Sequence, residues 1–306
     1  MSGILQPLLR PVLQPVLRSV LGPPMRGGGG DPLLEAILAL FANGEEGALY
    51  YFTEDFAGLY QDAVGTTPVT AVGQPVGLML DRRFGLARGP EEIDNWDFRN
   101  GGAGWNTGAN VTVSTAGAKF DSTPGGGGAV ATGLTLVPGA VYELIVSVEY
   151  VTAGAFRVYV GGTTTTFVGA GERRFLLAAG AGSATGVAAS GTTTALITSV
   201  SLRELPGNHA SQTTTTARPT LRSGPLRIDY DGVDDYLRTV FPDLGSAVTI
   251  APSTPGVGDQ ILTGQTIAAG NWDDNVTSCA TLVIDRALTG PGPALVTAFL
   301  NQQAGV

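Results

Sequence analysis

The chain has 306 residues, a formal net charge of −9 and 43% hydrophobic residues. This length allows two modest domains or one large β-sandwich with additions, and the hydrophobic content supports a buried core. Binding to nucleic acid requires clustered Lys and Arg, and no basic stripe follows residue 30, so a nucleic-acid partner is not expected. The 45 glycines and 19 prolines favour many short strands joined by tight turns.

The single cysteine and the single histidine limit the chemistry of the chain. Cys279 cannot form an internal disulfide or a cysteine metal cluster, and its apolar neighbours predict a small hydrophobic residue in a strand. His209 lies in a turn, where we expect a surface or interstrand residue. We therefore predict no metal site based on these residues, no cofactor and no catalytic residues. No uninterrupted apolar run reaches the roughly 18 residues of a membrane span, and prolines interrupt the apolar N-terminus, so no signal peptide is expected.

Residues 1–30 begin with a repeat of period four, which reads QPLL, RPVL, QPVL and RSVL from Gln6 to Leu21. Proline at every fourth position disfavours a regular α-helix, and the run Gly27–Gly30 is typical of a flexible hinge. We interpret this segment as an extended attachment arm that docks into an acidic partner. The alternative is that it packs on its own protein or bundles with identical copies. The residues expected to anchor it are Leu9, Leu13, Leu17, Leu21, Arg10 and Arg18.

Residues 31–47 show the signals of one short helix. Asp31 is a plausible N-cap, Pro32 suits the first helical position, and Asn43-Gly44 ends the run. The helical spacing is carried by Leu33, Leu34, Ile37, Leu38 and Phe41. The favoured interpretation is an amphipathic helix packed on a neighbour, which in an oligomer could be another copy of the chain.

From residue 48 onward the pattern changes to short strands and turns, with a closing helix expected at about Gly292–Gln303. Between Ile93 and Leu205 no helical period appears. An alternation of period two runs through Tyr142, Leu144, Val146, Val148 and Tyr150. We therefore predict a mainly β fold, in which an antiparallel β-sandwich or jelly roll (91–206) is inserted into a second β-rich unit (48–90 plus 207–306).

Two stretches resemble known families. NWDFRNGGAGW (Asn95–Trp105), LTLVPGAVYELIVSVEY (Leu134–Tyr150) and ALITSVSLREL (Ala195–Leu205) resemble jelly rolls of the carbohydrate-binding-module type. LYQDAVGTTPVTAVGQPVGLMLD (Leu59–Asp81) and LRIDYDGVDDYL (Leu226–Leu237) resemble a frame of phage and prophage virion proteins that leads into a concanavalin-like lectin sandwich. Only residues 238–306 follow the second phrase, so the lectin unit is expected to be shortened.

The acidic clusters offer little for catalysis. A glycan hydrolase needs two carboxylates at a defined separation, and the acidic residues here adjoin Gly, Pro or Asn, where they commonly cap turns. No G-x-S-x-G elbow is present for a serine hydrolase. The loop Asp231–Asp235 could hold calcium through oxygen ligands, although it lacks the EF-hand spacing. We therefore expect a protein that is not an enzyme, and the calcium question stays open.

Glycans are bound by aromatic faces that stack on sugar rings, with polar side chains at the ring edges. The candidates for such contacts are Trp96, Trp272, Tyr150 and Tyr159. Trp96 lies beside Asn95 and Asp97, and Trp272 lies between polar neighbours, as expected of an exposed platform. The alternative for each Trp is buried anchoring or a contact between subunits, and this alternative is favoured.

The resemblance implies a structural virion protein, which would be a spike, fibre or decoration subunit of a phage-like or gene-transfer particle. Its expected partners are other virion proteins, such as capsid vertex, portal or tail components, and host cell-surface polysaccharide. By analogy with fibres we expect a homo-oligomer, with a trimer favoured. The alternatives are a dedicated carbohydrate-binding adhesin and, less favoured, a polysaccharide-degrading enzyme. The position on head or tail, the copy number and the glycan are left open.

Overall fold

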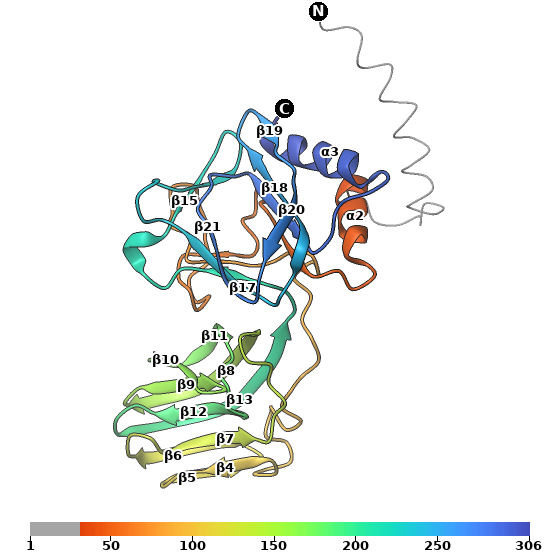
Figure 1. The fold of residues 1–306 in the computed structure, drawn as a ribbon. Coiled ribbons are helices and arrows are strands. Elements are labelled where there is room, and N and C mark those ends of the chain that lie inside the picture. Colours follow the sequence, from red (N-terminus) through yellow and green to blue (C-terminus); the bar gives the residue numbers. More distant parts are fainter. Residues whose placement is uncertain (1–30) are drawn as a thin grey trace, which may run out of the picture.

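A computed structural model describes residues 31–306. The attachment arm and the anchoring residues predicted within 1–30 lie outside the described residues, so these predictions stay untested. The described chain forms two β-rich units, the sandwich and the frame, with both helices on the frame (Figure 1). The prediction of a mainly β fold of antiparallel sheets is confirmed. Neither helix within 31–306 is long and apolar enough to cross a membrane.

The sandwich consists of two five-stranded antiparallel sheets whose strands all come from residues 105–205. The β9 sheet has the order β10 (Thr163–Phe167), β9 (Phe156–Val160), β12 (Ala184–Ala189), β7 (Gly128–Thr132) and β4 (Trp105–Thr107). The β8 sheet has the order β11 (Gly171–Ala178), β8 (Val141–Ala153), β13 (Thr193–Leu205), β6 (Gly117–Thr123) and β5 (Val111–Ser114).

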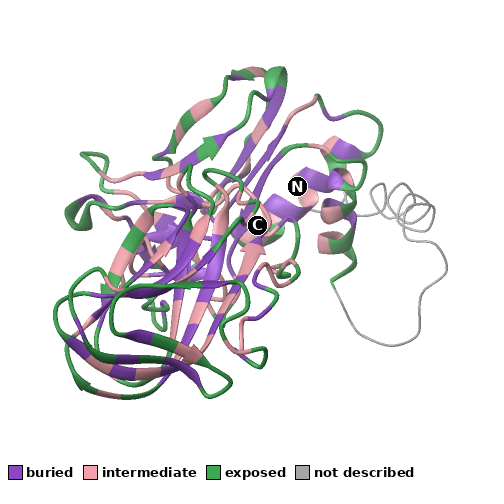
Figure 2. Ribbon diagram, turned by 90° about the horizontal axis from the view of Figure 1, so that it is seen from below, coloured by how far each residue is buried: buried purple, intermediate pink, exposed green. Residues whose placement is uncertain are grey.

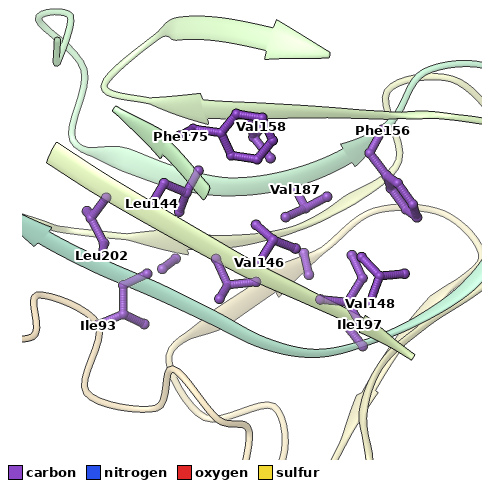
Figure 3. Packing of buried hydrophobic residues seen from close by; sticks show 14 of the residues in the cluster. Ile93, Leu144, Val146, Val148, Phe156, Val158, Phe175, Val187, Ile197 and Leu202 are labelled. Atoms are coloured by element: carbon purple, nitrogen blue, oxygen red, sulfur yellow. The ribbon is translucent and has the colours of Figure 1, made fainter. Parts of the chain in front are cut away.

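The core of the sandwich is made by side chains that alternate along these strands. Leu144, Val146 and Val148 of β8 point inward and lie among residues of the facing sheet, including Val158 and Val187 (Figure 3). All five are buried to 3% exposure or less. Figure 2 shows buried and more exposed residues alternating along the strands. Burial of each such side chain contributes about 1.5–3 kcal/mol to folding, so this alternation is the main local reason for the sandwich.

The alternation does not continue to Tyr150, because β8 contains a bulge. Val148 pairs with Ile197 and Tyr150 pairs with Leu196, so Glu149 is an extra residue in β8. A bulge reverses which side chains face the core beyond it. Val151 therefore packs against the core, and Tyr150 is 37% exposed. The inward alternation predicted through Tyr150 is wrong at its last position.

The frame is built from two further sheets and a hairpin. The β18 sheet contains β1 (Gly47–Tyr51), β22 (Ala280–Ile284), β18 (Gly245–Thr254) and β19 (Gly258–Asp259), and β20 (Leu262–Ile267) also pairs with β18. The β17 sheet has the order β2 (Leu59–Tyr60), β3 (Leu78–Met79), β14 (Ala210–Ser211), β17 (Leu237–Phe241) and β21 (Gly270–Asp274). A separate hairpin joins β15 (Thr220–Arg222) to β16 (Arg227–Asp229).

The middle of the β18 sheet is buried on both faces. Tyr50 and Val283 pack toward the β17 sheet, whereas Leu49 and Leu282 pack toward the helices. Every residue of β1 and β22 is buried as a result. The helices are α2 (Pro32–Leu38), which continues into η1 (Ala39–Phe41), and α3 (Gly292–Ala304), while the short η2 (Thr215–Ala217) lies in a loop.

Helix α2 begins as the sequence predicts, but its partner belongs to the same chain. The Asp31 carboxylate accepts a hydrogen bond from the Leu33 amide at 2.9 Å, and Pro32 occupies the first turn. Ala36 and Ile37 are buried in one cluster with Phe299 of α3. Because the apolar face is buried within the chain, this helix gives no support to the expected oligomer.

The sandwich and the frame touch through a small apolar cluster and a buried charge. Leu176 of β11 is buried with Tyr60, and its amide donates to the Val64 carbonyl at 2.7 Å. This contact covers part of the edge of β11, which would otherwise be free to pair with another chain. The buried carboxylate of Glu143 is paired with Arg88 and Arg174.

Candidate functional site

The outer face of the β9 sheet carries a row of five residues that runs across all of its strands. Strand pairing places Thr164 beside Tyr159, Tyr159 beside Gly186, Gly186 beside Val130, and Val130 beside Asn106. At about 4.8 Å between neighbouring strands, the row is roughly 19 Å long. Thr164 and Asn106 at its ends are exposed. The row therefore has exposed polar residues at both ends, a buried glycine at its centre and one half-buried aromatic side chain.

A second row lies next to the first and has small residues at its centre. It consists of Thr166, Arg157, Ala188 and Gly128. The packing requires glycine at residues 186 and 128. A Cβ atom on Gly186 would lie 2.3 Å from the Ala129 carbonyl oxygen, and one on Gly128 would lie 2.5 Å from the Val187 carbonyl oxygen. The two rows therefore form a face that is low in the middle, beside the larger Tyr159 and Arg157.

Tyr159 faces outward because its neighbours Val158 and Val160 belong to the sandwich core. Its side chain is nevertheless half-buried. Burial raises the pKa of the phenol to about 12, although the nearby Arg157 acts in the opposite direction. The hydroxyl is therefore protonated at neutral pH and can both donate and accept a hydrogen bond.

The chemistry of the two rows is that of binding. Tyr159 offers a π-face for apolar contact, and Thr164, Thr166, Asn106 and Arg157 offer hydrogen bonds at either side. The two rows contain no carboxylate and no histidine, so they offer no pair of groups for acid–base catalysis. Of these residues, the sequence predicted only Tyr159 as a binding residue. The others join it through strand register, which leaves no local signal in the sequence.

Tyr150, the second tyrosine predicted to bind glycans, is on the β8 sheet and faces solvent there. It is thus separated from Tyr159 by the full thickness of the sandwich. The structure does not bring these two residues together, and one ligand cannot contact both.

The two candidate tryptophans lie against hydrophobic cores. Trp96 packs on the sandwich core and is held by its backbone, since its carbonyl accepts from the Val200 amide at 2.8 Å. Trp272 packs on the frame core with its ring 5.8 Å from that of Phe241. Both are partly buried, so their packing favours the alternative of anchoring over that of an exposed platform.

The acidic loop after β16 places three carboxylates together. Oxygens of Asp231, Asp234 and Asp235 lie within 4.8 Å of one another. Oxygen ligands of this kind suit a hard cation such as Ca²⁺. However, one oxygen of Asp231 already accepts hydrogen bonds from the amides of Val233, Asp234 and Asp235, which is the ordinary role of aspartate in a turn. The loop is explained by this turn alone.

His209 and Cys279 have structural surroundings. His209 Nδ1 accepts a hydrogen bond from the Asp81 amide, and Nε2 lies 3.0 Å from the Leu205 carbonyl. Burial lowers the pKa of the imidazole to about 4, so it is neutral at physiological pH. Cys279 is buried, and burial raises the pKa of its thiol to about 11. Neither group is prepared for nucleophilic or acid–base catalysis.

Comparison with known proteins adds little beyond this geometry. No protein-family model matches the chain, and no curated protein matches it. Six chains of solved structures match. One of them is the N-terminal tandem of two CBM22 domains of Xyn10C from Paenibacillus barcinonensis, with 12% identity, a TM-score of 0.32, and coverage of 66% of this chain and 91% of that one. At this score the similarity carries no functional conclusion for the present chain.

Proposed function

We propose that the sandwich binds a glycan along the two rows of the β9 sheet without cleaving it. The observation that carries this proposal is the position of the half-buried Tyr159 directly beside Gly186, in a row with exposed polar residues at both ends. A pyranose ring has an apolar face and a polar edge. It would stack on the tyrosine while its hydroxyls bond to Arg157 and Thr164.

The wider role we propose is that of a structural subunit of a phage-like particle, displaying this face for attachment to host polysaccharide. Support comes from the resemblance of Leu59–Asp81 and Leu226–Leu237 to the frame of phage virion proteins. Partners would be other particle proteins, and a homotrimer would raise the affinity for repeated glycans by multivalency.

A glycan array probed with the full chain tests the binding proposal. Tyr159→Ala should lower the apparent affinity for any bound glycan at least tenfold, and Arg157→Ala should lower it less. Tyr150→Ala is the matched control, because this tyrosine is also solvent-facing but lies on the opposite sheet. The proposal fails if Tyr159→Ala binds as well as the unchanged protein, or if Tyr150→Ala is the weaker binder. Release of reducing sugar from a bound polysaccharide would instead indicate an enzyme.

Imaging of particles tests the wider role. Deleting the gene should leave particles that lack one appendage or decoration, and light scattering of the purified protein should give the mass of three chains. Unchanged particles would contradict the structural role while leaving the glycan-binding proposal intact.

A further inference from the structure

A cavity lies where the frame meets the sandwich, away from the β9 sheet. It has a volume of about 740 Å³ and is lined by residues of both units. The frame contributes residues of β14 and β17, and the sandwich contributes the loop before β8 and the end of β13. We call this cavity the inter-unit cleft. Its size is within the range of sites for small ligands.

The frame wall of the inter-unit cleft is formed by a face of the β17 sheet. Arg238 and Val240 alternate with the buried Thr239 and Phe241, and Arg238 pairs with Ser211 of β14. Two nitrogens of Arg238 bind the two carboxylate oxygens of Asp273 at 2.6 and 2.7 Å. Such bidentate pairing holds the guanidinium in one place, so this wall is organised before a ligand arrives.

Both walls also present apolar surface. Val240 of the frame is 57% exposed, and Val137 of the sandwich is 54% exposed. Pro138 follows Val137 along the cleft, and the ring of Tyr236 lies 4.9 Å from the Arg238 guanidinium. Apolar side chains that remain exposed in a concave site are commonly covered by a ligand.

Four polar side chains of the cleft have no hydrogen-bond partner among residues 31–306. Within residues 31–306, the side-chain oxygens of Glu204, Ser211, Thr213 and Tyr236 make no hydrogen bond and no ion pair to other residues. Of the cationic residues of the cleft, Arg83 is shared by Glu46 and Asp81, and Arg238 pairs with Asp273. Together with the unpaired Glu204, the carboxylates at the cleft outnumber its cations, and this net negative charge disfavours anionic ligands.

We propose that the inter-unit cleft is a binding site for a neutral saccharide. The apolar faces of the sugar would contact Val137 and Val240, and its hydroxyls would donate to Glu204 and exchange hydrogen bonds with Ser211 and Thr213. Binding in this cleft is independent of the face around Tyr159.

The test uses the full chain carrying Tyr159→Ala, so that binding on the β9 sheet is weakened. The probes are cellotetraose, xylotetraose, maltotetraose and mannotetraose, with trigalacturonate as the acidic comparison, titrated by calorimetry. At least one neutral probe should bind, and trigalacturonate should bind at least tenfold more weakly. Ser211→Trp, which fills the cleft, should abolish this binding, and Glu204→Ala should weaken it at least fivefold.

Thr112→Trp is the matched control, because it adds the same bulk at an exposed position on β5 and should leave the affinity unchanged. Thermal melts of all variants establish that each is folded, and Glu204→Ala serves as the milder change if Ser211→Trp does not fold. The proposal is overturned if no neutral probe binds, if trigalacturonate binds best, or if the affinity is insensitive to the change at Glu204.

Discussion

The amide of Asp81 donates a hydrogen bond to Nδ1 of His209 at 2.9 Å, across 128 positions of the chain. Asp81 follows β3, before the chain enters the sandwich, and His209 precedes β14, after the chain has left it. The Asp81 carboxylate also accepts from the amides of Leu49 and Asn208 and pairs with Arg83. This junction links the segment that leads into the sandwich to the segment that leaves it.

Replacing Asp81 should strongly destabilise the junction. Asp81→Ala leaves the amides of Leu49, Arg83 and Asn208 without this acceptor, and it leaves the buried Arg83 with Glu46 as its ion-pair partner. Removal of one member of a buried ion pair costs about 3–5 kcal/mol of the free energy of unfolding. Urea denaturation followed by circular dichroism measures this loss.

The control for this change is Asp121→Ala, which removes an exposed carboxylate paired with Lys119. That change should alter the free energy of unfolding by less than about 0.5 kcal/mol. Similar losses for the two variants would contradict the assigned role of Asp81.

The buried carboxyl of Asp274 should make stability depend on pH. Burial raises its pKa from 3.8 to about 6, although a hydrogen bond from the Val276 amide acts in the opposite direction. A carboxyl group whose pKa is higher in the folded than in the unfolded state contributes stability at low pH, below its pKa in the unfolded state. This contribution is lost as the pH rises through about 6. At about 1.4 kcal/mol per pKa unit, Asp274→Asn should gain up to about 3 kcal/mol at pH 7.

The measurement compares urea midpoints of the unchanged protein and Asp274→Asn at several values between pH 4 and pH 7.5. The difference between the two proteins should grow with pH across this range. The pKa of Asp81 is also raised, so its effect on stability has the same pH dependence, whereas the lowered pKa of His209 gives the opposite dependence. Because both residues are present in the two proteins, their contributions cancel in the difference. A difference that is constant with pH would refute the assignment.

Leu176 should couple the two units thermodynamically. It is buried against Tyr60 and Leu205 in the cluster that joins sandwich and frame. Leu176→Ala would leave a cavity there, with an expected cost of about 2–5 kcal/mol. In calorimetry the variant should melt in two separated transitions, whereas Val168→Ala, at a position 66% exposed, should melt like the unchanged protein.

The sandwich is expected to fold by itself when it is expressed as residues 91–206. It should show a β-type circular dichroism spectrum and a cooperative melt. A fragment that begins at residue 87 should be more stable, because Arg88 pairs with the buried Glu143. A disordered spectrum for both fragments would refute the domain boundary.

The N-terminal arm is expected to anchor the protein to its particle. Deletion of residues 2–26 should leave the melting temperature of the β units unchanged but remove the protein from purified particles. Quantitative immunoblotting of particles measures this loss. Incorporation at the normal copy number would show that the anchor lies elsewhere.

The features that the sequence determined are those encoded by neighbouring residues. Asp31 and Pro32 fix the start of α2 through a side-chain cap and a preset φ angle, and the alternation from Tyr142 to Val148 predicts a strand with one buried face. Each of these signals acts over a few residues. They can therefore be recognised without knowing which distant residues pack against them.

Only the tertiary structure decided which distant residues meet. The bulge at Glu149 turns Tyr150 outward. The pairing of the five strands of the β9 sheet brings Thr164, Gly186 and Asn106 into line with Tyr159. A shift of any of these strands by one residue would put the opposite side chains on the outer face without changing its local pattern. The row and the inter-unit cleft therefore depend on register and packing, which are properties of the whole fold.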